Sequence, residues 1–174
     1  MGRGFAYATA DGVKFKVDDF ESKFDHILFK DRTDLPDSVK KIGDRYPINA
    51  DKAGKVYHIN DLPDSIKAKL KAEIPDFDLK YPDGVRFDEY GFPDFGPYAT
   101  HTVKLEKFSP GKHSIDGAKA DIEVRKIYPN YVRPDGYTWH HHQDGSTMQL
   151  VPQSLHDTFK HTSGMAITKH KAKK

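Results

Sequence analysis

The sequence predicts an α+β protein, with a C-terminal module of strands and helices that follows a mixed N-terminal extension. Three observations indicate this class: short runs of period-two alternation, one helix with regularly spaced apolar residues, and a strand–turn–strand–helix order near the C-terminus. The 174 residues fit one domain, or one domain with a substantial N-terminal extension. Eleven Phe and nine Tyr supply apolar area for a core, so disorder throughout the chain is excluded.

The N-terminal half is predicted to hold two short strands and one helix. Residues 13–17 alternate apolar and charged side chains, and residues 56–59 form a second short β candidate. Residues 61–74 predict a helix, with Asp61 as the capping residue and Pro75 as the residue that stops it. Its apolar positions recur every four residues, at Ile66, Leu70 and Ile74.

A change of composition marks the predicted boundary between two parts of the chain. Residues 75–98 are rich in Pro, Gly, Asp and aromatic side chains, which favours an ordered but irregular segment anchored by its rings. We therefore divide the chain into an N-terminal region, residues 1–78, and a C-terminal domain, residues 79–174. The N-terminal region is interpreted as an adaptor or as an elaboration of the C-terminal domain.

The C-terminal domain begins with a predicted strand and a predicted helix. Residues 102–108 alternate as a strand, and residues 118–127 predict a helix capped by Ser114 or Asp116 and ended by Pro129. Three residues share one face of this helix and are expected to turn toward the core: Ile115, Ala118 and Ile122.

Five of the ten histidines lie between residues 140 and 161, at positions 140, 141, 142, 156 and 161. The runs 137–143 and 147–151 are strand-like, and Asp144–Gly145 between them is a strong signal for a two-residue hairpin turn. Pro152 closes the second run and starts a helix that is expected to continue to about His161.

This order of elements brings imidazoles together. His140 and His142 share one side of their strand while His141 points to the other, although twist near a strand end relaxes this rule. His156 lies in the first turns of the helix and can face back across the hairpin. His161 is about 140° further round the helix, so it reaches the same site only if the helix has ended. Neutral imidazoles are good metal ligands and good bases near neutral pH.

Composition limits the chemistry of the site. Cysteine is absent, so disulfides and thiolate ligands are excluded, and a metal must be held by His, carboxylate, amide or water. The net charge of +2 argues against a surface coated with basic charge for tight, non-specific nucleic-acid binding. No apolar run approaches membrane-spanning length, so no membrane insertion is expected.

The ordered string of motifs in this region resembles the nuclease toxins of the HNH/endonuclease VII superfamily that carry a Trp-His-His signature and occur in bacterial polymorphic toxin systems. The matching segments are Trp139–His141, Asp144–Gly145, Met148–Pro152, Leu155–His156 and His161–Gly164. Residues 91–98 also resemble a segment that precedes the signature, and the similarity covers roughly residues 80–168. Ser163–Gly164 is a small departure, because the family often has two glycines there.

The resemblance implies a ββα-metal nuclease fold for the C-terminal domain and a metal-dependent endonuclease activity. It implies that His140 and His156 bind one divalent ion, with Mg, Zn, Ni and Mn all open. It makes His141 the general base and Gln149 a residue that orients this base or contacts the backbone. His142 and His161 are possible additional members of the site, and Trp139 is expected to support it structurally.

The resemblance also implies a biological setting. The expected substrate is DNA, cut with little sequence specificity, and the expected partners are a cognate immunity protein and a larger secreted toxin polypeptide or a secretion machinery. The protein would then be secreted or delivered into the cytoplasm of a target bacterium. Two alternatives stay open: a metal-dependent RNase or other phosphodiester hydrolase, and a non-catalytic binding module whose histidines hold a structural metal.

Overall fold

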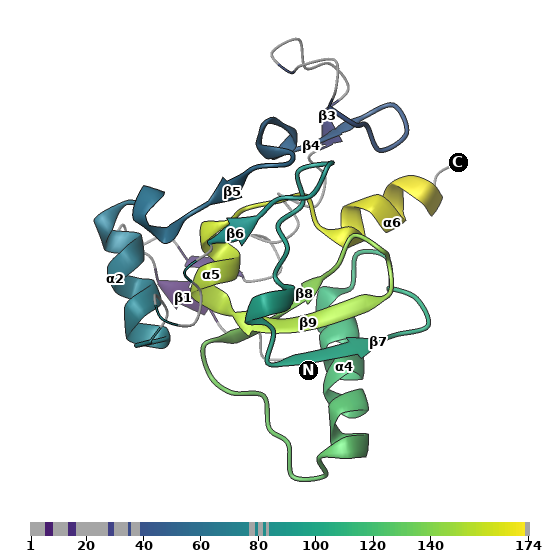
Figure 1. Ribbon diagram of the computed structural model, residues 1–174. Coiled ribbons are helices and arrows are strands. Elements are labelled where there is room, and N and C mark those ends of the chain that lie inside the picture. The colour runs from purple at the N-terminus through teal and green to yellow at the C-terminus, as the bar shows by residue number, and fades with distance from the viewer. Residues whose placement is uncertain are drawn as a thin grey trace.

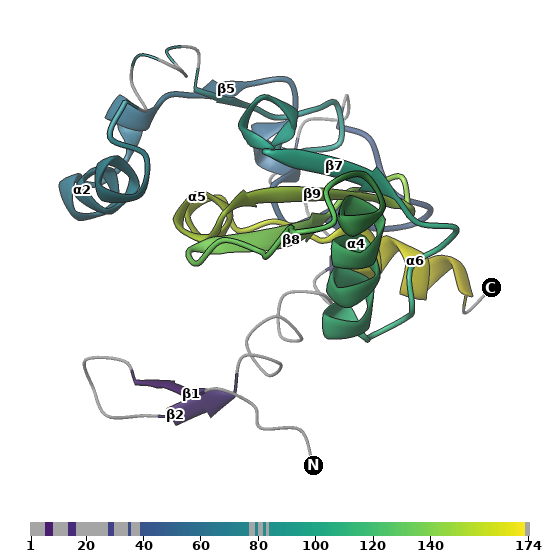
Figure 2. The same cartoon turned by 90° about the horizontal axis from the view of Figure 1, so that it is seen from below.

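The computed structural model describes residues 39–76 and 84–172, together with the short stretches 6–8, 14–16 and 28–29 and positions 35, 79 and 82. Over these residues it combines four small antiparallel sheets with four α-helices, which confirms the predicted α+β class. Figures 1 and 2 show the three-stranded sheet near the middle of the molecule, with helices on either side of it. None of the described helices is both long and apolar enough to cross a membrane.

The N-terminal half supplies three of these sheets, each of two strands. The pairs are β1 (Ala6–Ala8) with β2 (Lys14–Lys16), β3 (Leu28–Phe29) with β4 (Tyr46–Pro47), and β5 (Val56–Tyr57) with β6 (Val85–Arg86). The strand predicted at residues 13–17 is confirmed by β2. The strand predicted at residues 56–59 is shorter than expected, because a 3-10 helix, η2 (Ile59–Asp61), begins at its end.

The helix predicted at residues 61–74 is α2 (Asp64–Glu73), which begins after Pro63. Asp61 does not cap it, because its carboxylate accepts the backbone N–H of His58 at 3.0 Å and closes the preceding 3-10 turn. The apolar spacing of the helix was predicted correctly at Leu70, which is fully buried.

Three further elements precede or join the central sheet. They are the 3-10 helices η1 (Ala50–Lys52) and η3 (Gly96–Tyr98), and the strand β7 (His101–Lys104). The segment at residues 84–98 is irregular and rich in buried rings, as the composition predicts. Phe87, Phe92 and Phe95 in this segment are buried.

The central sheet has the order β7–β9–β8, with β8 at Tyr137–His141 and β9 at Thr147–Pro152. All pairs are antiparallel, and His140 lies opposite Gln149 while His141 lies opposite Met148. Consecutive side chains of a strand point to opposite faces of the sheet, so His140 and His141 lie on different faces. Each of them shares its face with the residue directly opposite on β9.

The hairpin between β8 and β9 has a longer connection than the two-residue turn predicted at Asp144–Gly145. Residues 142–146 lie between the strands. A two-residue type I′ turn needs a positive φ at both central residues, and only Gly145 has one here, at 86°. The Asp144 carboxylate instead accepts the backbone N–H groups of Ser146 and Thr147, which closes a wider turn.

α4 (His113–Ile127) crosses one face of the sheet (Figures 1 and 2) and starts earlier than the predicted helix at residues 118–127. Ser114 and Asp116 therefore lie inside its first turn. The predicted apolar face is wrong: Ile115 and Ile122 are exposed. The side that packs on the sheet carries Ala120 and Val124 together with two buried aspartates, Asp116 and Asp121.

The other face of the sheet is covered by α5 (Gln153–Thr158), by α2 and by the segment at residues 84–98. Leu70 and Ile74 of α2 pack with Leu155 and Phe159 in one apolar cluster, and Figure 1 shows α2 beside α5. The chain then passes through residues 159–163 into α6 (Gly164–Ala172). Strand, turn, strand and helix follow one another as predicted from residue 137 to 158, while the assignment of this unit to the ββα-metal fold stays a prediction.

Residues of the N-terminal region also form hydrogen bonds with the segment that follows α5. The side-chain amide of Asn49 donates to the carbonyl oxygen of Lys160, and the hydroxyl of Thr162 accepts the backbone N–H of Ile48 at 2.9 Å. Glu73 of α2 accepts hydrogen bonds from the hydroxyl and backbone N–H of Ser154, at the start of α5. The elements around His156 and His161 are thus fixed from both halves of the chain.

Candidate metal centre

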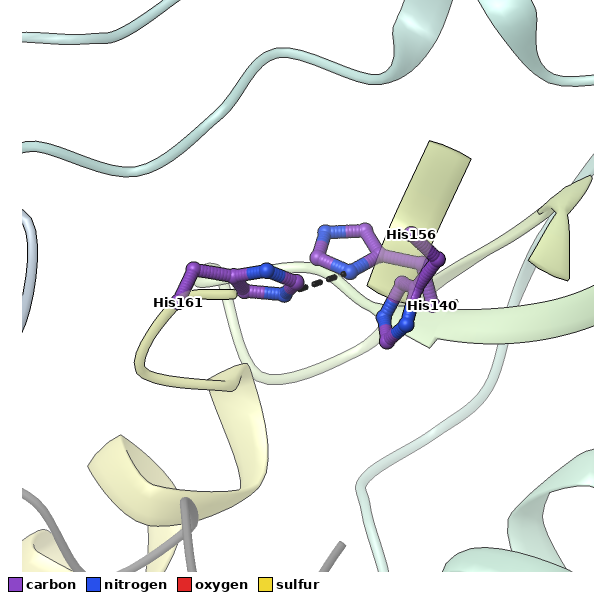
Figure 3. A group of neighbouring side chains, drawn as sticks. All are labelled: His140, His156 and His161. Atoms are coloured by element: carbon purple, nitrogen blue, oxygen red, sulfur yellow. Dashed lines mark hydrogen bonds between the residues drawn. The ribbon is translucent and has the colours of Figure 1, made fainter. Parts of the chain in front are cut away.

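Three histidines from three separate segments converge beside the central sheet. His140 lies on β8, His156 lies on α5, and His161 lies in the segment between α5 and α6. One ring nitrogen from each lies within 4.8 Å of those of the other two, and Figure 3 shows the three rings gathered together. This is the group of side chains in the described part of the chain that is arranged to hold a metal ion.

His161 reaches the group because α5 is short. The sequence predicts a helix through about residue 161, but α5 ends at Thr158 and Phe159 is its C-cap. His161 can reach the site only if the helix has ended before it, and the structure meets this condition. Gly164 supports this path, because a Cβ at that position would overlap the carbonyl oxygen of His142.

Hydrogen bonds fix which nitrogen of His161 faces the group. Its Nδ1 lies 2.7 Å from the carbonyl oxygen of Phe159, which can only accept, so the Nδ1 carries the proton. Its Nε2 therefore presents a lone pair, and this atom lies 3.1 Å from Nδ1 of His140 (Figure 3).

Burial keeps the central ring neutral. His140 is 2% exposed. Burial, and then the neighbouring His161 and His156, hold the pKa of His140 well below its ordinary value of 6.5. A neutral imidazole offers a lone pair to a metal at neutral pH, so the low pKa favours ligation.

Phe95 is a member of the site that sequence reasoning did not assign to it. Its ring is fully buried, and its centroid lies 5.0 Å from that of His140, 5.8 Å from that of His156 and 5.4 Å from that of His161. The sequence predicts Phe95 as a packing anchor, which is confirmed.

The three imidazoles fit a divalent metal ion. Two nitrogens bound to one tetrahedral zinc ion at about 2.0–2.1 Å lie about 3.3–3.4 Å apart, close to the 3.1 Å between His140 Nδ1 and His161 Nε2. His140 Nε2 is buried and has no hydrogen-bond partner among the described residues. His161 already has its other nitrogen bonded to a carbonyl, which is the usual arrangement for a ligating imidazole.

His142 lies near this group without belonging to it. Its ring centroid is 6.5 Å from that of His140. The ring is half-buried, and its Nδ1 accepts the backbone N–H of Asp144 at 3.3 Å. That contact directs Nδ1 into the turn.

His141 lies on the other face of the sheet, under α4. Its Nε2 is 3.4 Å from a carboxylate oxygen of Asp116, and its ring meets those of Phe108 and His113 edge-on at 4.8 and 4.7 Å. Burial raises the pKa of the Asp116 carboxyl, but hydrogen bonds from His141 and Ser109 outweigh this effect and leave its pKa below the ordinary value. An ionised carboxylate therefore accompanies the His141 ring.

Gln149 does not lie with His141. It is directly opposite His140 on β9, so its side chain shares the His140 face of the sheet. Gln149 is 8% exposed, and its Oε1 has no hydrogen-bond partner among the described residues. The structure thus brings together His140, His156, His161 and Gln149, and it places His141 apart from them with Asp116.

Trp139 is buried in the apolar cluster between α4 and the sheet, as predicted for a supporting residue. Its indole Nε1 donates to Asp121 of α4 at 2.8 Å. Asp121 lies outside the face of α4 that the apolar spacing of Ile115, Ala118 and Ile122 had marked, so this pairing was not predicted.

Comparison with known families identifies the C-terminal segment. Residues 129–171 match the family model WHH, described as a nuclease of the HNH/ENDO VII superfamily with conserved WHH. The chain has one Trp, so this signature falls on Trp139–His141. No curated protein matches the chain. Residues 129–171 are therefore similar to the WHH nucleases of the HNH/ENDO VII superfamily, and this similarity supports nuclease activity.

Proposed function

We propose that the protein is a metal-dependent endonuclease whose metal is held by His140, His156 and His161. The observation that carries the proposal is the convergence of these three imidazoles within 4.8 Å, inside the segment that is similar to WHH nucleases. Histidines far apart in the chain seldom meet in a buried group without a function, because each needs a partner for its ring nitrogens.

The protein's own residues prepare the site for this chemistry. His161 is fixed by the Phe159 carbonyl, and His140 is kept neutral by burial. Phe95 packs against all three rings and excludes water from their buried side. A divalent ion bound there would polarise the scissile phosphate and stabilise charge on the leaving oxygen.

We assign the general base to His141, which takes a proton from the attacking water. The Asp116 carboxylate, 3.4 Å from Nε2, orients the ring and favours the imidazolium that proton transfer forms. His141 is the last residue of β8, where the strand gives way to the turn.

The proposed substrate is DNA, cut with little sequence specificity. The proposed setting is a toxin that is delivered into the cytoplasm of a target bacterium and neutralised by an immunity protein. The support for the substrate and the setting is the resemblance of the motif string to toxin nucleases. RNA as the substrate is the competing possibility for the same site.

Supercoiled plasmid tests the activity. The full chain is incubated with plasmid in EDTA and with added Mg²⁺, Mn²⁺, Ni²⁺ or Zn²⁺, and a matched set receives structured RNA. Nicking and linearisation that need a divalent ion, with RNA left intact, are expected. RNA degradation with intact plasmid would replace DNA by RNA as the substrate. Metal binding without cleavage of either polymer would favour a binding module with a structural metal.

A further inference from the structure

Two buried polar atoms in neighbouring residues of the central sheet lack hydrogen-bond partners among the described residues. One is Nε2 of His140, and the other is Oε1 of Gln149. Both residues are more than nine-tenths buried. A buried polar group without a partner is costly, so each of these atoms calls for a contact that the protein acquires in its working state.

His140 and Gln149 lie close enough in the sheet for these two atoms to become hydrogen-bond partners. His140 and Gln149 are directly opposite across β8 and β9, on the same face of the sheet. In such a pair the Cβ atoms lie about 4.5–5.5 Å apart. His140 Nδ1 is the atom that faces His161 Nε2, at 3.1 Å. Nε2 is therefore the nitrogen of His140 that remains for a contact outside the histidine group.

The chemistry of a ligating imidazole gives the two atoms complementary roles. When Nδ1 binds a metal, the ring proton must lie on Nε2, which becomes a donor. A ligating histidine nearly always donates its second N–H to a carboxylate, a carbonyl or a water. An amide oxygen such as Gln149 Oε1 is an acceptor, and it is buried without a donor.

Each of the other two histidines has an acceptor beside its Nδ1. His161 donates from Nδ1 to the Phe159 carbonyl at 2.7 Å. His156 has its Nδ1 3.8 Å from a carboxylate oxygen of Asp157, an acceptor next to the ring. His140 is the member of the group whose second nitrogen, Nε2, is buried without a hydrogen-bond partner among the described residues.

We propose that Gln149 is a positioning residue of the metal centre: its Oε1 accepts a hydrogen bond from His140 Nε2–H, directly or through one buried water, when His140 binds the ion through Nδ1. This inference rests on the proposed metal-dependent function. It separates Gln149 from the general base, which lies on the other face of the sheet, and assigns it to the ligand His140.

The test measures metal affinity and not cleavage. Zn²⁺ and Mn²⁺ are titrated calorimetrically into the metal-free full chain and into three variants. Gln149→Met keeps the length of the side chain and removes the acceptor, so affinity is expected to fall about 10- to 100-fold. Gln149→Glu keeps an acceptor and is expected to bind at least as tightly as the wild type. Gln143→Met removes another buried, unpartnered amide oxygen of the same hairpin and is expected to leave affinity unchanged.

Thermal unfolding in EDTA distinguishes this role from a structural one. Without metal, Gln149→Glu is expected to melt lower than Gln149→Met, because it buries a carboxylate near no cation. The order of the two variants thus reverses between apo stability and metal affinity. The same order in both measurements, or a wild-type affinity for Gln149→Met, would overturn the inference and leave the metal centre standing. A wild type that binds neither ion would overturn the inference together with the proposed function.

Discussion

The indole Nε1 of Trp139 donates a 2.8 Å hydrogen bond to the carboxylate of Asp121, between α4 and the central sheet. The same carboxylate accepts two hydrogen bonds from the guanidinium of Arg133, at 3.2 and 2.6 Å. Trp139 immediately precedes His140 on β8, so this network fixes the strand from which the metal-centre histidine projects. The buried Trp139 thus ties β8 to α4 through Asp121.

Replacing Trp139 by Phe is expected to destabilise the fold by about 1–3 kcal/mol, because Asp121 loses a donor while it stays buried. Urea denaturation in EDTA measures this change. Ile122→Ala is the matched control on α4: Ile122 is 53% exposed, so its truncation is expected to change stability by no more than about 0.5 kcal/mol. Equal losses for the two variants would contradict the assignment of the two faces of α4.

The face of α4 illustrates what a hydrophobic pattern cannot reveal. The periodicity at residues 115–122 predicted that isoleucines pack on the core, but the helix is turned so that Asp116 and Asp121 are buried instead. These carboxylates are buried because they meet His141 and Trp139, which lie on a strand more than fifteen residues away in sequence. The spacing of apolar residues within one helix cannot reveal partners that only the tertiary fold brings to its polar residues.

His161→Ala is expected to lower the affinity for a divalent ion by more than about 100-fold, since it removes one of the three proposed ligands and even the loss of an outer-shell partner costs about 10- to 100-fold. Calorimetric titration of the metal-free protein measures the change. His142→Ala is the control, because His142 lies outside the group of three. The metal affinity of this variant is expected to match that of the wild type. Strong loss in the His142 variant with none in the His161 variant would mean that a different set of nitrogens binds the ion.

The approach of His140 and His156 to each other was predictable from the sequence, because a strand–turn–strand–helix order brings them together; their role as metal ligands is what the family resemblance implies. His161 could only be stated conditionally, since its contribution depends on where α5 ends. Phe95 could not be predicted as a neighbour of the histidines: it belongs to an irregular segment whose path is set by packing and not by a repeating pattern.

His141→Ala is expected to reduce plasmid cleavage by about 10²- to 10⁴-fold, the range for a lost general base, with metal affinity retained. Asp116→Asn is expected to cause a smaller loss, because the ring stays in place while the charge that favours its protonated form is gone. Glu123→Gln, at a partly exposed position of the same helix where the carboxylate pairs with Lys126, is the control for a lost carboxylate on α4. Full cleavage by the His141 variant would move the base to another residue.

The packing of α2 on α5 predicts that the N-terminal half contributes to the stability of the metal centre. Leu70→Ala is expected to cost about 2–5 kcal/mol, because Leu70 is fully buried against the cluster that contains Leu155. Lys69→Ala, on the exposed side of α2, is the control and is expected to have little effect. Both are measured by chemical denaturation.

A fragment of residues 79–174 extends the same test to the predicted domain boundary. It lacks Leu70, Ile74 and the hydrogen bonds that Asn49 and Glu73 make to the region around α5. We expect this fragment to melt at a lower temperature and less cooperatively than the full chain in circular dichroism. A fragment as stable as the full chain would support residue 78 as the end of an independent N-terminal region.

The turn between β8 and β9 predicts a pH dependence. Burial would raise the pKa of Asp144, but hydrogen bonds from the Thr147 hydroxyl and from the backbone N–H groups of Thr147 and Ser146 outweigh it and lower the pKa from 3.8 to about 2. A carboxylate with a lowered pKa in the folded state stabilises the fold above its unfolded-state pKa, and this contribution disappears as the pH falls through the folded-state value. The hairpin is therefore expected to lose this contribution between about pH 4 and pH 2.

Comparison of the wild type with Asp144→Asn isolates this contribution, since Asn cannot titrate. Urea denaturation from pH 5 to pH 2 in EDTA is expected to show the wild type more stable at pH 5, by on the order of 1 kcal/mol after solvent screening of a partly exposed group. The difference should shrink as the pH falls, because protonated Asp144 and Asn then offer the turn similar neutral acceptors. A difference that stays constant over this range would mean that Asp144 stabilises the hairpin through its shape and not through its charge.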